Sequence, residues 1–163
     1  AFEKAVLFAP LVRPADHWWG RPAHAILKFF RKRIPRRFAE SSGDGKFLRF
    51  LRKSDPLQAK YLSLPWVAAW KKWEPKFLKL SESNLTPLII QGDDDHTVAW
   101  QFNLKVISKI FPNASVKVLK GAKHHLVNET RDIREKLWDT VDDYILSDKK
   151  AESTEELSGT PDA

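Results

Sequence analysis

Two short segments hold the side chains whose types and spacing could do chemistry. The first is QGDDDHTVAW, residues 91–100, in which three aspartates and a histidine follow an apolar run. The second is GAKHHLVNE, residues 121–129, which contains His124 and His125. Neighbouring carboxylates and imidazoles can act as a catalytic acid and base, bind a metal ion, or be the solvated side chains of a turn. The elements that position the two segments favour one of these.

Three short apolar segments are the predicted strands of this region. They span residues 5–9, 87–91 and 115–119, and the first is a continuous apolar run that suits a strand buried on both faces. Apolar residues at helical spacing predict amphipathic helices over 100–111 and 133–145. Strand, helix, strand, helix in that order predicts an α/β fold with parallel strands and a right-handed crossover.

Both polar segments follow predicted strands, at the edge where function gathers in an open parallel sheet. Adjacent parallel strands bring the two loops side by side, so we expect Asp95 to lie within hydrogen-bond reach of His124. Such a pair is what a Ser-His-Asp hydrolase requires, because the carboxylate orients the imidazole that takes the serine proton. Asp93, Asp94 and His96 are expected to be exposed.

A metal site is the alternative chemistry. Its ligands would be Asp93, Asp95, His124 and His125. The spacing does not match a helical His-x-x-x-His arrangement, so this interpretation is less favoured.

The two segments resemble loops of a known family. PLIIQGDDDHTVAW resembles the acid loop of α/β-hydrolases of the monoacylglycerol lipase and lysophospholipase (serine-aminopeptidase-like) branch, with Gly92, Asp95 and Val98 at the matching positions. GAKHHLVNE is similar to that family's histidine loop, Gly-Ala-any-His-any-Leu. FEKAVLFAP resembles the strand that follows the nucleophile helix. The resemblance covers residues 2–146.

The resemblance implies a serine hydrolase, specifically a carboxylic ester hydrolase of the lipase or lysophospholipase kind. Asp95 would be the catalytic acid, His124 the catalytic base, and His125 a supporting neighbour of the base. The substrate would be a lipid-like acyl ester, and neither a cofactor nor a metal is implied. For both loops, the alternative is a solvated turn with an ordinary surface histidine.

The nucleophile of such an enzyme has no counterpart in this sequence. No Gly-x-Ser-x-Gly elbow occurs, and the Ser41-Ser42-Gly43 segment lacks the first glycine. The sequence contains no methionine and begins at Ala1. We therefore expect a fragment, the carboxyl-terminal half of a lipase-like hydrolase, whose partner is an amino-terminal half that carries the elbow. Alone, the chain is expected to be inactive.

The expected organisation has four parts. Residues 1–10 are a core strand, 11–80 a mostly helical cap-like insertion with its return helix, 81–146 the carboxyl-terminal α/β core, and 147–163 a disordered acidic tail. Pro75 is expected to break or kink the helix over 64–80. Trp66, Trp70, Trp100 and Leu126 are the candidate lining of a substrate pocket, with a place in the core as the alternative for the tryptophans.

Charge suggests a further partner. The chain has a net charge of +7, and residues 28–53 hold ten lysines and arginines against Glu40 and Asp44. Phe29, Phe30 and Ile34 beside these basic residues predict an interfacial helix that contacts an anionic membrane. A non-catalytic module that binds membrane or nucleic acid is the alternative function, although the leading interpretation expects no nucleic acid.

Location follows from what the sequence lacks. It has no apolar run long enough to span a bilayer and no signal-peptide pattern, while the absence of cysteine leaves the compartment open. We expect a cytoplasmic protein with peripheral membrane contact.

Overall fold

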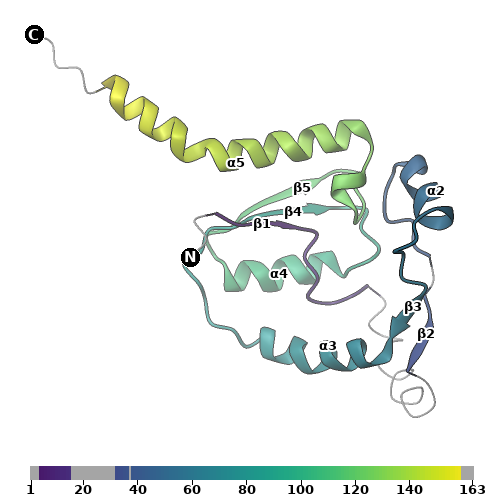
Figure 1. Ribbon diagram of the computed structural model, residues 1–163. Coiled ribbons are helices and arrows are strands. Elements are labelled where there is room, and N and C mark those ends of the chain that lie inside the picture. Colours follow the sequence, from purple (N-terminus) through teal and green to yellow (C-terminus); the bar gives the residue numbers. More distant parts are fainter. Residues whose placement is uncertain (1–3, 16–31, 37, 159–163) are drawn as a thin grey trace, which may run out of the picture.

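A computed structural model describes residues 4–15, 32–36 and 38–158 (Figure 1). Three strands, β1 (Val6–Phe8), β4 (Leu88–Gly92) and β5 (Ser115–Leu119), form a parallel sheet in the order β1-β4-β5. Val6 pairs with Leu88, and Leu88 pairs with Ser115. The predicted parallel sheet of about three strands is confirmed.

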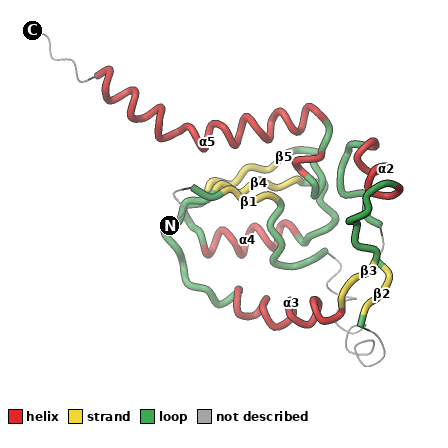
Figure 2. The backbone as a smooth tube through the Cα atoms, in the orientation of Figure 1, coloured by secondary structure: helices red, strands yellow, loops and turns green. Residues whose placement is uncertain are grey.

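Helices cover both faces of this sheet (Figures 1 and 2). α4 (Trp100–Ile110) lies on one face, with α3 (Leu64–Phe77) beyond it, and α5 (Arg131–Ser158) lies on the other. Because successive side chains of a strand point to opposite faces, Ile89 packs toward Ile107 of α4, while Ile90 packs toward Leu137 of α5. Full burial of each such side chain stabilises the fold by about 1.5–3 kcal/mol.

α3 is anchored on the segment that follows β1. The Trp70 indole is buried and its Nε1 donates to the Val12 carbonyl at 2.8 Å. Buried Glu74 accepts a hydrogen bond from Arg13 Nε at 2.6 Å. Pro75 lies in the last turn, where it has no N–H for an i→i−4 hydrogen bond; the helix passes it and ends two residues later at Phe77.

The described part of the insertion contains strands as well as helices. Its described part holds an antiparallel pair, β2 (Arg33–Pro35) with β3 (Tyr61–Ser63), and one helix before α3, which is α2 (Gly45–Lys53). Asp44 caps α2 by accepting from Lys46 N at 2.7 Å and Phe47 N at 3.2 Å.

The prediction of an interfacial helix is wrong at its carboxyl end, because Ile34 lies in strand β2 and pairs with Leu62. Phe29 and Phe30 lie outside the described residues.

The tail that was expected to be disordered, residues 147–163, is helical over the part that the structure describes. Residues 147–158 continue α5 without interruption, and the helix extends past the sheet (Figure 1). Ala151, Glu152, Glu155 and Leu157 favour helix by intrinsic propensity, and a helix already nucleated on the core needs only to be extended. In the part of the chain that the structure describes, no helix has the length and hydrophobicity needed to cross a membrane.

Candidate active site

Asp95 and His124 meet at the carboxyl end of the sheet, as predicted. Asp95 follows β4, and His124 follows β5. The carboxylate Oδ2 of Asp95 lies 2.9 Å from Nδ1 of His124. The Asp95 side chain is fully buried, whereas the imidazole keeps about a quarter of its surface accessible. The pair therefore joins a buried carboxylate to an imidazole that solvent can reach.

Four donors surround the Asp95 carboxylate. Oδ1 accepts from the backbone N–H groups of Thr97 at 2.8 Å and Val98 at 3.2 Å. Oδ2 accepts from Gln91 Nε2 at 2.9 Å and from His124. Burial alone would raise the pKa of Asp95, but the hydrogen bonds from His124, Gln91 and Thr97 and the charge on His124 outweigh it, so this pKa lies below its ordinary value.

The ionised carboxylate determines which nitrogen of His124 carries a proton. A carboxylate can only accept, so Nδ1 must be the donor in the 2.9 Å contact. In the neutral imidazole, Nε2 is then left with a lone pair. This is the tautomer that a general base in a serine hydrolase needs.

Gly92 and Asp93 hold the two loops together. A Cβ at Gly92 would lie 2.1 Å from the Ala122 carbonyl oxygen, so only glycine lets the histidine loop approach this closely. Asp94 N donates to the same oxygen at 3.0 Å, and Gly121 N donates to Asp93 Oδ1 at 2.6 Å. Asp93 is exposed, as expected, and its carboxylate also bridges the two loops. Asp94 contacts the exposed His96 at 3.0 Å.

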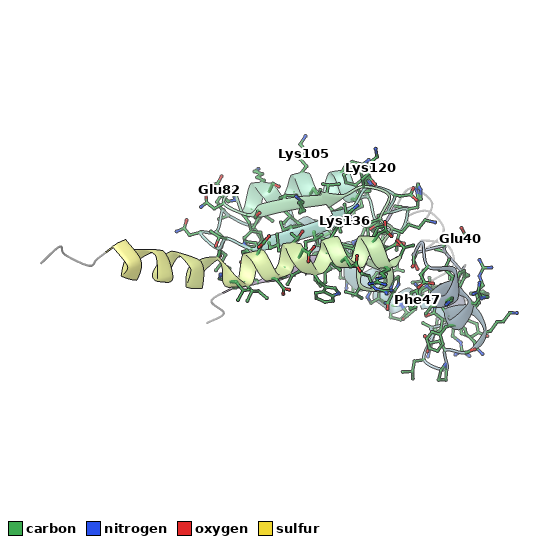
Figure 3. All side chains as sticks on the ribbon, turned by 90° about the horizontal axis from the view of Figure 1, so that it is seen from above. Glu40, Phe47, Glu82, Lys105, Lys120 and Lys136 are labelled. Atoms are coloured by element: carbon green, nitrogen blue, oxygen red, sulfur yellow. The ribbon has the colours of Figure 1, made fainter. Side chains whose placement is uncertain are left out.

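His125 packs beside His124. Its ring lies edge-on to His124, with centroids 5.7 Å apart, and against Phe47 of α2 at 5.5 Å. Burial, together with the charge of Arg36 and the charge that His124 carries when protonated, lowers the pKa of His125. Figures 1 and 3 both show α2 beside the start of α5, with Phe47 labelled in Figure 3.

A cavity of about 100 Å³ opens beside the two histidines. Its lining comes from the insertion and from both loops, namely Arg36, Phe38, Ala39, Ser41, Leu51, Gln58, Thr97, His124 and His125. The insertion residues of this lining were not among the predicted site residues. Their only signal in the sequence is proximity to the ESSGDG turn, which gives no hint that Ser41 and Ser42 are buried.

The four predicted pocket residues do not line this cavity. Trp70 is buried against Val12, and Leu126 is buried in the core under α5. Trp66 exposes 47% of its surface on α3, and Trp100 is half-buried at the start of α4. Among residues 4–15, 32–36 and 38–158, no group of three or more His, Asp and Glu side chains is arranged to hold a metal ion.

The sheet order, the crossover helix and the loops carrying Asp95 and His124 define part of an α/β-hydrolase fold. A soluble variant of monoglyceride lipase from Saccharomyces cerevisiae, in complex with a substrate analogue, is similar to this chain with a TM-score of 0.73 and 19% identity. Monoacylglycerol lipase from Paleococcus ferrophilus is similar with a TM-score of 0.70 and 13% identity.

The similarity extends over most of this chain and part of each lipase. It covers 88% of the chain and 52% of the yeast lipase, and 87% of the chain and 58% of the Paleococcus lipase. The chain thus spans about half the length of these structures, which is consistent with the expected carboxyl-terminal half. No protein-family model and no curated protein matches the sequence.

Proposed function

We propose that the chain supplies the acid and the base of a serine-dependent carboxylic ester hydrolase. Asp95 is the acid and His124 the base. The observation that carries this proposal is the 2.9 Å contact between a buried, ionised carboxylate and a partly accessible imidazole that borders a cavity. The fold shared with two lipases supports the same reaction class.

In this proposal, a serine from outside the 163 residues attacks the ester carbonyl. Nε2 of His124 takes the hydroxyl proton as the C–O bond forms, and Asp95 stabilises the resulting imidazolium. The imidazolium then gives its proton to the leaving alcohol as the ester bond breaks. Water, deprotonated by the same imidazole, releases the acid and restores the serine.

The proposed substrate is a lipid-like acyl ester. The two similar structures are a monoglyceride lipase and a monoacylglycerol lipase, which makes a monoacylglycerol or a lysophospholipid the first compounds to test. The cavity beside His124 has apolar walls from Phe38, Ala39 and Leu51 and polar ones from Arg36 and Gln58. Such a mixed lining suits the carbonyl region and alcohol of an ester rather than a long acyl chain.

Peripheral membrane contact remains part of the proposal, now carried by α2. Lys46, Arg49, Phe50 and Lys53 share one exposed face at helical spacing, and Phe50 exposes 48% of its surface. Leu57, which follows the helix, exposes 90%. An apolar side chain among basic ones is the pattern of a surface that contacts anionic lipid.

Ester hydrolysis tests the proposal. The chain is assayed on p-nitrophenyl esters alone and after a segment with a Gly-x-Ser-x-Gly elbow has been joined upstream. We expect background rates alone, turnover in the joined protein, and loss of turnover in its His124→Ala variant. His96→Ala is the matched control, because His96 lies in the acid loop with an 85% exposed side chain. Turnover by the chain alone, or by the joined His124→Ala protein, would disprove it.

A further inference from the structure

Glu129 is a fully buried carboxylate outside the Asp95–His124 pair. Its Oε1 accepts from the backbone N–H of Lys123 at 2.8 Å. Its Oε2 accepts from the N–H of Gly43 at 2.7 Å and from the N–H of Thr130 at 3.2 Å. A buried carboxylate is costly unless its oxygens are hydrogen-bonded, and here three backbone donors meet that need, one of which, Gly43, is distant in the chain.

These contacts restrain the backbone on both sides of His124. Lys123, which precedes it, donates to Glu129. His125, which follows it, donates its N–H to the Ser41 carbonyl at 2.8 Å. Glu129 also holds residues 41–43, because it accepts the N–H of Gly43. The Glu129 carboxylate therefore restrains Lys123 directly and His125 through residues 41–43 of the insertion.

A second set of hydrogen bonds also joins residues 42–44 of the insertion to the histidine loop. Ser42 is fully buried, and its hydroxyl donates to the Asn128 carbonyl at 2.7 Å and accepts from Asp44 N at 2.9 Å. Asp44 caps α2, the helix that carries Phe47 against His125. A Cβ at Gly43 would lie 2.7 Å from Glu129 Oε2, which explains the glycine in this turn.

We propose that Glu129 is a positioning residue that couples the imidazole of His124 to the placement of residues 41–44 and α2. When the Glu129–Gly43 contact is intact, the histidine loop is held with Nδ1 of His124 on Asp95. When it is broken, the loop relaxes and Nδ1 loses its fixed acceptor. A catalytic consequence rests on the proposed function, but the coupling itself does not.

The coupling is measured on the 163-residue chain by the ring nitrogen chemical shifts of His124, which report the nitrogen that carries the proton. The variants are Glu129→Gln, which puts an amide NH₂ against backbone donors, and Gly43→Ala, which crowds the carboxylate without removing it. Glu135→Gln is the matched control, because Glu135 is an exposed glutamate paired with Arg131 on α5. Thermal unfolding is followed in parallel, and spectra are recorded well below each midpoint.

In the unaltered chain and in Glu135→Gln, we expect the Nδ1–H form to dominate when the imidazole is neutral. Glu129→Gln and Gly43→Ala should raise the Nε2–H fraction at least about tenfold, the factor expected when a charged hydrogen bond is lost. If Glu129→Gln does not fold, Gly43→Ala decides alone. Lower unfolding midpoints with unchanged His124 shifts would show a merely structural role and overturn the proposal. Because no ester is used, the result is independent of whether the chain serves a hydrolase.

Discussion

Replacing Gly92 by alanine should damage the candidate site through the backbone alone. The added methyl would lie 2.1 Å from the Ala122 oxygen, 2.5 Å from the Ala122 carbonyl carbon and 2.8 Å from the Lys123 oxygen. All three atoms belong to the backbone of the histidine loop, so no side chain can turn away to relieve the overlap. The loop itself has to move.

The size of that movement follows from van der Waals contact. Carbon and oxygen atoms pack at roughly 3.4 Å or more, so the Ala122 carbonyl must withdraw by about 1 Å. That withdrawal breaks the 3.0 Å bond from Asp94 N and carries His124 away from Asp95. Overpacking of this kind costs about 1–3 kcal/mol, and a misplacement of about 1 Å at a catalytic group can cost about 10²-fold in rate.

Urea unfolding and His124 ring nitrogen shifts measure the two effects. Two further glycines provide controls. A Cβ at Gly45 would meet only the flexible end of Arg49, at 3.5 Å, so Gly45→Ala should be neutral or slightly stabilising. Gly121 has open space but a φ of +73°, so Gly121→Ala should cost roughly 1 kcal/mol through strain. The reasoning fails if Gly92→Ala unfolds within about 0.5 kcal/mol of the unaltered chain and keeps the His124 signature.

Four further predictions concern turnover, pH dependence, a buried ion pair and membrane binding. Asp95→Asn in the joined protein should lower ester turnover by about 10⁴-fold, the effect of an amide that favours the wrong imidazole tautomer, and a loss below tenfold would contradict the assignment. The pKa of Asp95 is lowered in the folded chain, so its ionised carboxylate stabilises the fold above the unfolded pKa of about 3.9, and this contribution is lost as pH falls through the folded pKa. Between pH 5 and pH 2, the urea unfolding midpoint should therefore fall less for Asp95→Asn than for the unaltered chain. Glu74→Ala breaks a buried ion pair and should lower the free energy of unfolding by about 2 kcal/mol or more. Glu135→Ala breaks an exposed ion pair and should lower it by at most about 0.5 kcal/mol. Equal losses in urea unfolding would refute the distinction. Phe50→Ala should weaken binding to anionic vesicles, with Leu80→Ala, 53% exposed on a different segment, as the control; the idea fails if both bind as the unaltered chain does.

The α/β core and the contact between Asp95 and His124 could be predicted because their signals are local. β4 is buried on both faces, and a continuous apolar run is the direct consequence of that burial. Asp95 and His124 could be paired because each follows a strand of a parallel sheet, where topology alone brings the loops together. The close approach of the two loops depends on Gly92, and a glycine at this position can be read directly from the sequence.

The insertion could not be predicted in the same way. β2 and β3 are three-residue strands that pair Arg33 with Ser63 across a long separation, and neither has a strong apolar pattern. Glu129 and Ser42 are polar residues whose burial depends on a tertiary contact between distant segments. The tryptophan spacing on α3 marked a packed helix, and Trp70 turned toward the core rather than toward a pocket.

Fluorophosphonate labelling of the nucleophilic serine in the joined protein tests the central claim most directly, because the probe reports activation of the serine without assuming a substrate. If Asp95 and His124 are its acid and base, labelling should be rapid with the unaltered chain and with His96→Ala. It should be slower by about 10³-fold or more with His124→Ala. Labelling of the His124→Ala protein at the unaltered rate would contradict the account.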